Sequence, residues 1–332
     1  MSPTKYATIT RDALPKGIML KRVLIALICV TSCMANAQKA PVTLAERFTK
    51  IRQAIDRAPP PLLYGKHVVF VAGIMNELAD LISNYFPDNI EAVQNMGATT
   101  SYLAPSSSLS IPQNAQILYR EIRSIYDGVR SPLVLVGHSK GGAEVLHLIL
   151  EHPELVLDGI VDTVLLIQPA IGGSPLAYKS GPWISLVSAF LSPNLETLTP
   201  HKAKENFDLA FAKYDSALAK LVSARQLRAT QEAISKRIFY IRATQDPAQL
   251  GWGVGLVLRV WRSTLSYDTP NDGLLPLTSQ IDPRIGTDLG VLRADHIDLV
   301  VSEVTNMSAF DRKAVTYAAF EQIAAVRALV RL

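Results

Sequence analysis

A serine lies between two glycines in residues 137–141, Gly-His-Ser-Lys-Gly, which fit the pattern Gly-x-Ser-x-Gly. Residues 132–136 before it form an apolar run typical of a buried strand, and the apolar residues after it recur at helical spacing. A tight turn between a strand and a helix exposes the serine hydroxyl and points the first amides of the helix toward developing negative charge. We therefore predict that Ser139 is a nucleophile that attacks a carbonyl carbon; an ordinary glycine turn is the alternative.

A serine hydroxyl is a weak nucleophile until a base, most often a histidine, accepts its proton. His296 lies in residues 294–298, Ala-Asp-His-Ile-Asp, directly after a short strand that we predict around residues 291–292, whereas His201 lies within a helical pattern. For a serine on such a turn, the expected order along the chain is serine, acid, histidine. We predict that His296 is the base, and a polar loop histidine is the alternative.

An acid is needed to orient the imidazole and to stabilise its charged form. Two aspartates follow the apolar strand that we predict at residues 237–243. Asp246 comes directly after this strand, and Asp272 comes later, in residues 271–276, Asn-Asp-Gly-Leu-Leu-Pro, beyond an apolar insert. Their positions along the chain leave both candidates open.

The elements that must position these residues alternate along the chain. Short apolar runs predict buried strands at residues 67–73, 132–136, 161–168 and 237–243, with amphipathic helices between them. This alternation predicts an α/β fold, in which a mostly parallel sheet is flanked by helices. In such a sheet, ligands bind at the carboxyl ends of the strands.

The pattern changes between residues 174 and 236, where aromatic and aliphatic residues precede a long helical repeat. We predict that residues 174–236 are an inserted helical cap or lid. Its apolar residues Trp183, Phe190 and Leu191 favour an acyl-chain substrate or association with a membrane surface. Packing of the cap onto the core is the alternative explanation.

Several short motifs resemble, in the right order, those of secreted bacterial triacylglycerol lipases and esterases of the α/β-hydrolase superfamily. Residues 137–142 resemble their nucleophile turn, residues 271–276 their acid loop, and residues 294–299 their histidine loop. Residues 172–177, Gly-Gly-Ser-Pro-Leu-Ala, resemble a segment that follows the next strand in such lipases. The resemblance implies an α/β-hydrolase fold and the hydrolysis of carboxylic esters.

The resemblance also implies roles for individual residues. It favours Asp272 over Asp246 as the acid, which would leave Asp246 to cap a turn before a proline. An oxyanion hole would use the N–H of Lys140, which follows the nucleophile, and one N–H from the loop after the first core strand. The His-Gly pair of these lipases maps the second donor onto Ile74, and Ala72 stands here in place of the histidine.

Residues 1–37 have the layout of a signal peptide, with the cationic pair Lys21-Arg22, an apolar run over residues 23–30 and small residues at the end. The apolar run is well short of the roughly 20 residues that span a bilayer. We predict a secreted or periplasmic protein in which residues 38–332 form one α/β-hydrolase domain.

Two alternatives concern this leader. Met19 would start a more compact signal peptide, and residues 30–33, Val-Thr-Ser-Cys, resemble a lipobox that would make the protein a lipoprotein anchored through Cys33. Cleavage after Ala37 would instead remove both cysteines, Cys29 and Cys33, and with them any disulfide or cysteine nucleophile.

The composition narrows the choice of partners. The 332 residues are 48% hydrophobic, enough for a large core. The formal charge is +4, but five of the 33 basic and one of the 29 acidic residues lie before residue 38, so the remainder is neutral. We therefore expect no nucleic acid partner. The sequence contains no metal-ligand cluster and no phosphate-binding glycine loop, so we predict no cofactor. The sequence does not indicate an oligomeric state.

Together these features predict an exported serine hydrolase that cleaves small-molecule or lipid esters by two-step acyl transfer. Alternatives with the same three residues are a phospholipase, a polyester depolymerase and an acyltransferase. A non-catalytic binding module on a hydrolase fold is a further alternative, because a fold does not by itself establish an activity.

Overall fold

The computed structural model describes residues 42–54, 58–74, 85–178, 195–245, 270–302 and 310–330. Contacts divide the chain into two compact units, Met1–Val42 and Thr43–Leu332, and every element below belongs to the second. The predicted signal peptide with Met19 and Cys33, and the alternative acid Asp246, lie outside the described residues.

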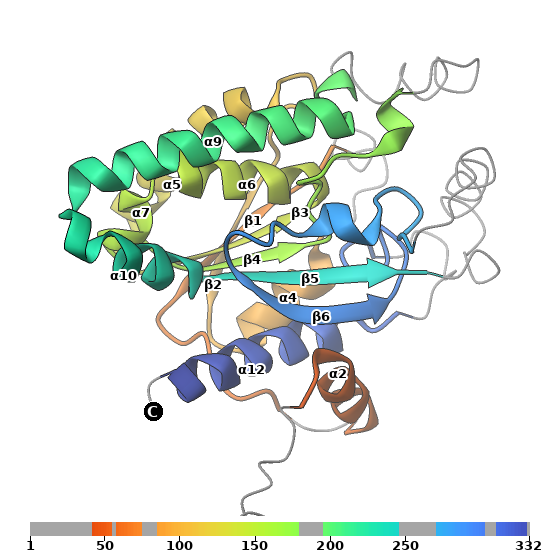
Figure 1. Ribbon diagram of the computed structural model, residues 1–332. Helices are drawn as coiled ribbons and strands as arrows, with labels where there is room; N and C mark the ends of the chain where they lie inside the picture. The colour runs from red at the N-terminus through yellow and green to blue at the C-terminus, as the bar shows by residue number, and fades with distance from the viewer. Residues whose placement is uncertain are drawn as a thin grey trace, which may run out of the picture. The chain divides into compact units, whose positions relative to one another are not determined.

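Six strands form one sheet in the order β2-β1-β3-β4-β5-β6, and every neighbouring pair is parallel (Figure 1). The strands are β1 (His67–Val71), β2 (Thr99–Leu103), β3 (Leu133–His138), β4 (Val161–Ile167), β5 (Ile238–Thr244) and β6 (Thr287–Arg293). Every residue of β1 and β3 is buried, which accounts for their continuous apolar sequences. Because all six strands run in the same direction, the loops after them meet at one edge of the sheet.

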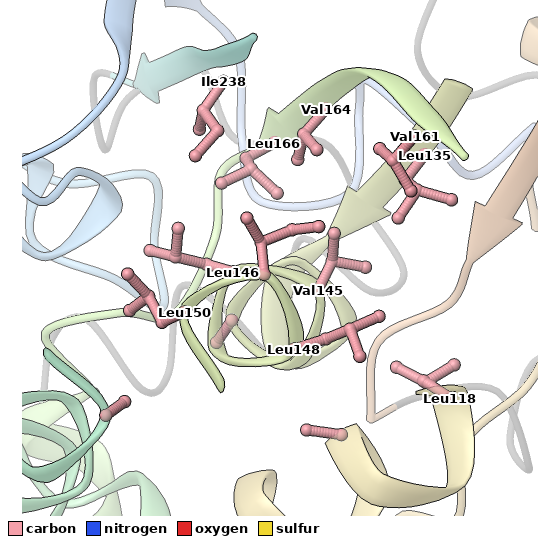
Figure 2. Packing of buried hydrophobic residues seen from close by; sticks show 14 of the residues in the cluster. Leu118, Leu135, Val145, Leu146, Leu148, Leu150, Val161, Val164, Leu166 and Ile238 are labelled. Atoms are coloured by element: carbon pink, nitrogen blue, oxygen red, sulfur yellow. The ribbon is translucent and has the colours of Figure 1, made fainter. Parts of the chain in front are cut away.

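Three helices cover one face of the sheet: α5 (Ile111–Val129), α6 (Ser139–Glu151) and α9 (Pro200–Leu221) (Figure 1). Figure 2 shows Val145 and Leu146 of α6 on the side of that helix that faces Val164 and Leu166 of β4. The α9 helix packs against α6. The α6 helix, which begins at Ser139, is therefore held between the sheet and a further helix.

The other face is covered by α2 (Leu44–Gln53), α4 (Pro87–Asn95) and α12 (Arg312–Val330) (Figure 1). A second apolar cluster joins them to the sheet and includes Phe70, Phe239 and Phe320. The remaining described elements are α7 (Glu154–Leu157), α10 (Ala224–Ser235) and the short 3₁₀ helices η1 (Pro175–Tyr178), η2 (Leu195–Leu198) and η4 (Leu277–Gln280). None of the described helices is long and apolar enough to cross a membrane.

The helix α5 illustrates how local sequence sets the elements. Ser110 precedes it and accepts a hydrogen bond from the Gln113 amide, while the Gln113 side chain accepts from the Ser110 amide. This reciprocal arrangement satisfies two amides that the first helical turn leaves unpaired. The buried residues that follow recur at helical spacing and join the core, namely Ala115, Leu118 and Ile122.

The prediction of a parallel α/β sheet flanked by helices is confirmed. The described part of residues 174–236 contains η1, η2, α9 and α10, and Phe207, Tyr214 and Leu218 of α9 are buried in the core. The apolar side of α9 thus packs into the core. Trp183, Phe190 and Leu191 lie outside the described residues, so the role of a lid stays a prediction.

Candidate active site

Ser139 lies at the junction of β3 and α6, at the edge of the sheet where the strands end. Its φ angle is 54°, in the left-handed region that costs a non-glycine residue roughly 1–2 kcal/mol. The Ser139 carbonyl accepts a hydrogen bond of 2.9 Å from the Ala170 amide, which ties the turn to the loop after β4. Ser139 is mostly buried, and 9% of the residue is exposed to solvent. Strain of this kind persists where the surrounding structure enforces it.

The two glycines of the pattern permit close backbone contacts. A Cβ atom on Gly137 would lie 2.8 Å from the Cα atom of Gly142, and one on Gly141 would lie 2.7 Å from the carbonyl oxygen of Val71. Both distances are shorter than any real Cβ contact, and both neighbours are backbone atoms that cannot move aside easily. The glycines therefore let the start of α6 pack directly against the end of β1, which keeps the Ser139 turn at the sheet edge.

His296 joins Ser139 to Asp272. Its Nε2 lies 2.8 Å from the Ser139 Oγ, and its Nδ1 lies 2.7 Å from the Asp272 Oδ2. The His296 amide also donates to the Asp272 carbonyl oxygen at 2.9 Å, and the residue is only 2% exposed. The structure thus brings together three residues that are 157 and 24 positions apart in the chain.

Asp272 is fully buried and surrounded by hydrogen-bond donors. Its Oδ1 accepts from the amides of Leu274 and Leu275, at 3.0 and 2.7 Å. Its Oδ2 accepts, besides His296, the side-chain amides of Gln168 and Gln280, at 2.9 and 3.2 Å. These donors hold the carboxyl group in place, so that it can orient the imidazole of His296.

The loop that carries Asp272 returns to the end of β5 although it follows a long insert. The Gln245 amide and the Thr244 hydroxyl both donate to the Asn271 carbonyl oxygen, at 3.0 and 3.1 Å. On the other side, the Ser174 hydroxyl donates to the Leu274 carbonyl oxygen at 2.6 Å. The segment 172–177, which resembles a lipase motif, thus helps to hold the acid loop.

The two amides expected to form an oxyanion hole belong to Lys140, the residue after Ser139, and to Ile74, in the loop after β1. A Cβ atom on Gly73 would lie 2.8 Å from the Ser139 Cβ, so the loop after β1 lies directly against the serine. The next residue, Ile74, has its carbonyl oxygen bound by the Ser107 hydroxyl at 2.6 Å. Within the described part of the chain, neither the Ile74 nor the Lys140 amide donates a hydrogen bond. Both are therefore available to a ligand.

The Lys140 side chain is buried and its ammonium group has partners inside the protein. Its Nζ lies 2.9 Å from Glu144 and donates to the Ser106 carbonyl oxygen at 3.1 Å, and both charged side chains are almost fully buried. Burial raises the pKa of Glu144 to about 7, although Lys140 and the Asn114 amide lower it. Lys140 can contribute its backbone amide to the site, but its ammonium group is already engaged.

Two further acidic residues, Asp295 and Asp298, flank His296 in sequence and bind backbone amides. The Asp295 carboxylate accepts from the amides of Ile297 and Asp298, both at 2.9 Å, and Asp298 accepts from the Asp295 amide. Burial, and then the charge of Asp298, raise the pKa of Asp295 to about 7. Among the described residues, no group of three or more His, Cys, Asp or Glu side chains could hold a metal ion.

Sequence reasoning missed four residues that support this site: Tyr85, His138 as a hydrogen-bonding group, Gln168 and Gln280. Gln168 carries a usable signal, because it ends a predicted strand at the edge where ligands bind, and its φ angle of 44° is unusual for a non-glycine residue. Gln280 lies in η4 and offers no local signal. Tyr85 and His138 form a separate chain of hydrogen bonds with the loop after β1.

No protein-family model matches the sequence, and no curated protein matches it either. Solved structures do match. A metagenomic carboxyl esterase is 22% identical, with 81% of this chain and 76% of the esterase covered and a TM-score of 0.56. A mature lipase of Bacillus licheniformis is 18% identical, with 80% of this chain and 92% of the lipase covered and a TM-score of 0.54. At such identities the likeness establishes the fold alone: this chain has the α/β-hydrolase fold.

Proposed function

We propose that this protein is a serine hydrolase that cleaves carboxylic esters through an acyl-enzyme. The observation that carries the proposal is the unbroken hydrogen-bond chain from Ser139 Oγ to His296 Nε2, at 2.8 Å, and from His296 Nδ1 to Asp272 Oδ2, at 2.7 Å. A nucleophile, a base within reach of its proton and a buried acid that orients the base are the parts that acyl transfer requires.

In the first step, Ser139 Oγ attacks the ester carbonyl carbon while its proton passes to His296 Nε2. Asp272 holds the imidazole and stabilises its positive charge, and the amides of Lys140 and Ile74 donate to the oxyanion. His296 then protonates the leaving alcohol as the carbon–oxygen bond breaks. In the second step, a water gives a proton to His296 and attacks the acyl-enzyme carbonyl carbon. His296 then returns this proton to Ser139 Oγ as the bond between this oxygen and the acyl carbon breaks, which releases the acid and restores the Ser139 hydroxyl.

The comparisons support an ester as the substrate, because the same fold occurs in a carboxyl esterase and in a lipase. The expected reactive bond is therefore a carboxylic ester in a small molecule or a lipid. Discrimination between lipase, phospholipase, polyester depolymerase and acyltransferase activity needs a substrate screen, in which acyl-chain length, head group and added alcohol acceptors are varied.

The test is the hydrolysis of p-nitrophenyl esters with acyl chains of two to sixteen carbons. Wild-type protein is expected to turn over at least part of the series, and Ser139→Ala to lower kcat by at least roughly 10³-fold. Ser131→Ala, in the turn before β3, serves as a matched control and should keep wild-type activity. A folded wild-type protein that hydrolyses no ester, or a Ser139→Ala variant with full activity, would contradict the proposal.

We also propose that residues 1–37 direct export and are removed after Ala37, from the layout of charged, apolar and small residues. N-terminal sequencing of the protein recovered from its native compartment tests this. A mature terminus at Gln38 is expected. A lipid-modified terminus at Cys33 would instead mean a membrane-anchored lipoprotein, and an intact leader would contradict export by this route.

A further inference from the structure

A chain of hydrogen bonds runs behind the candidate site from the loop after β1 to the backbone of His296. The Gly73 amide lies 3.0 Å from the Tyr85 hydroxyl, and this hydroxyl lies 2.5 Å from the Nδ1 of His138. The Nε2 of His138 lies 2.8 Å from the carbonyl oxygen of His296. At one end of this series of hydrogen bonds, Gly73 and Tyr85 lie near Ile74, the expected oxyanion donor. At the other end is His296, the proposed base.

Chemistry fixes the direction of every bond in this chain. The His296 carbonyl oxygen can only accept, so Nε2 of His138 carries a proton and donates it. In a neutral imidazole Nδ1 is then without a proton, so it accepts from the Tyr85 hydroxyl. The tyrosine oxygen keeps a lone pair, which accepts from the Gly73 amide. All groups in the chain are thereby satisfied in one protonation state.

The surroundings favour that protonation state. Burial, and then the positive charge that His296 can carry, lower the pKa of His138 well below its ordinary value. Burial likewise raises the pKa of Tyr85 far above its ordinary value, so its hydroxyl keeps the proton. The Tyr85 ring also packs against Phe86 and against the edge of the His138 ring, at centroid distances of 4.9 and 5.7 Å. The tyrosine is therefore held in place by contacts that do not need its hydroxyl.

The Tyr85–His138 hydrogen bonds hold the backbone at two places, at His296 and in the loop after β1. The His296 amide donates to Asp272 and its carbonyl oxygen accepts from His138, so both backbone groups of the histidine are tied down. In the loop after β1, the Gly73 amide is bound by Tyr85 and the Ile74 carbonyl oxygen by Ser107. The Ile74 amide lies between these two anchors and is available to a ligand. An amide held in this way needs no reorganisation when negative charge develops.

We propose that Tyr85 and His138 are positioning residues, which act as one unit to align the Ile74 amide with the oxyanion and the His296 ring with Ser139. This inference rests on the proposed ester hydrolysis and extends it. It assigns a purpose to the histidine within the Gly-His-Ser-Lys-Gly pattern. It also places a tyrosine beside the loop in which the resembling lipases carry a His-Gly pair.

The first test is Tyr85→Phe, which removes one oxygen atom and keeps the ring contacts. We expect kcat for a p-nitrophenyl ester to fall by roughly 10- to 100-fold, with KM changed by less than about twofold. The affinity for a trifluoromethyl ketone, which forms a tetrahedral oxyanion on the serine, should weaken by about the same factor. Tyr214→Phe is the matched control, because this buried tyrosine has no hydrogen-bond partner for its hydroxyl within the described residues.

The second test asks whether Tyr85 and His138 act together on catalysis or only stabilise the fold. His138→Gln places an amide nitrogen near the position of Nε2 and should retain more activity than His138→Ala. The double variant Tyr85→Phe/His138→Ala should lose little more kcat than His138→Ala alone, because the chain is already broken. Wild-type kcat in Tyr85→Phe would overturn the proposal. Losses that multiply in the double variant, or losses explained by a lower Tm with no change in inhibitor affinity, would overturn it as well.

A third measurement does not depend on activity. In wild-type protein labelled with ¹⁵N-histidine, the His138 nitrogens should report a neutral ring with the proton on Nε2 at neutral pH. A proton on Nδ1, or a charged ring at neutral pH, would overturn the chain of bonds. Failure of ester hydrolysis with the expected His138 signals would instead refute the proposed function and leave the bond chain intact.

Discussion

The buried ion pair beneath the nucleophile turn gives a prediction whose size follows from the structure. Lys140 and Glu144 are 3% and 1% exposed at their side chains and 2.9 Å apart. The substitution Lys140→Met keeps most of the side-chain volume and leaves Glu144, among the described residues, with the Asn114 side-chain amide at 2.6 Å. At an effective dielectric constant near 20, the lost attraction is about 6 kcal/mol. Because the carboxyl group can escape part of this cost by binding a proton, we expect a net loss of about 3–5 kcal/mol at pH 9.

The loss of folding stability in Lys140→Met should become larger as the pH rises. The pKa of Glu144 is already raised from 4.5 to about 7, so its ionisation lowers the stability of the wild-type protein as pH rises through that interval. Removal of Lys140 raises this pKa further, so the variant continues to lose stability above pH 7, by up to about 1.4 kcal/mol per pH unit. Near pH 6 both proteins carry a protonated Glu144, and the difference should shrink to about 1–2 kcal/mol.

Urea denaturation of wild type and Lys140→Met at pH 6, 7.5 and 9 measures this difference. The matched control is Lys202→Met, which breaks an ion pair of the same 2.9 Å length whose side chains are 54% and 58% exposed. It should cost less than about 1 kcal/mol at every pH. A loss in Lys140→Met that is independent of pH, or no larger than that in the control, would refute the reasoning.

Three further predictions concern single residues. Gly73→Ala would place a Cβ atom 2.8 Å from the Ser139 Cβ; we expect a fall in kcat of roughly 100-fold with the circular dichroism spectrum unchanged, and wild-type kcat would contradict it. Burial alone would raise the pKa of Asp162, but neighbouring cations lower it from 3.8 to about 2. This carboxylate therefore contributes about 2 kcal/mol above pH 4 that is lost as pH falls toward 2, and chemical denaturation should find Asp162→Asn less stable at pH 7 but not at pH 2. The pKa of Asp295 is raised, so the effect has the opposite sign: between pH 4 and 7 the unfolded chain loses the Asp295 proton while the folded protein keeps it, and wild-type stability falls. Asp295→Asn should lack this part of the fall in the same denaturation series and keep the part that comes from Glu144.

The parts of the fold and site that could be predicted from sequence are those with local signatures. Buried parallel strands have continuous apolar sequences, and the Ser139 turn needs glycines on both sides, so both were accessible to pattern reasoning. Asp272 was favoured over Asp246 only through resemblance, because the hydrogen bonds that bring Asn271 back to the end of β5 have no local signature.

The supporting residues could not be predicted for the same physical reason. Tyr85 meets His138 across 53 positions of sequence, and Gln168 meets Asp272 across 104. Such contacts depend on which strands lie side by side, and the sequence pattern does not specify strand order. A buried tyrosine or glutamine in an isolated sequence is more often a satisfied core residue than part of a site.

The central claim, that Ser139 is a nucleophile activated by His296, is tested most directly by labelling with a fluorophosphonate and locating the adduct by peptide mass spectrometry. The account predicts one adduct on Ser139 in wild-type protein, none in Ser139→Ala, and labelling at least roughly 100-fold slower in His296→Ala. Absence of an adduct on Ser139 in folded wild-type protein, or equally fast labelling without His296, would contradict it.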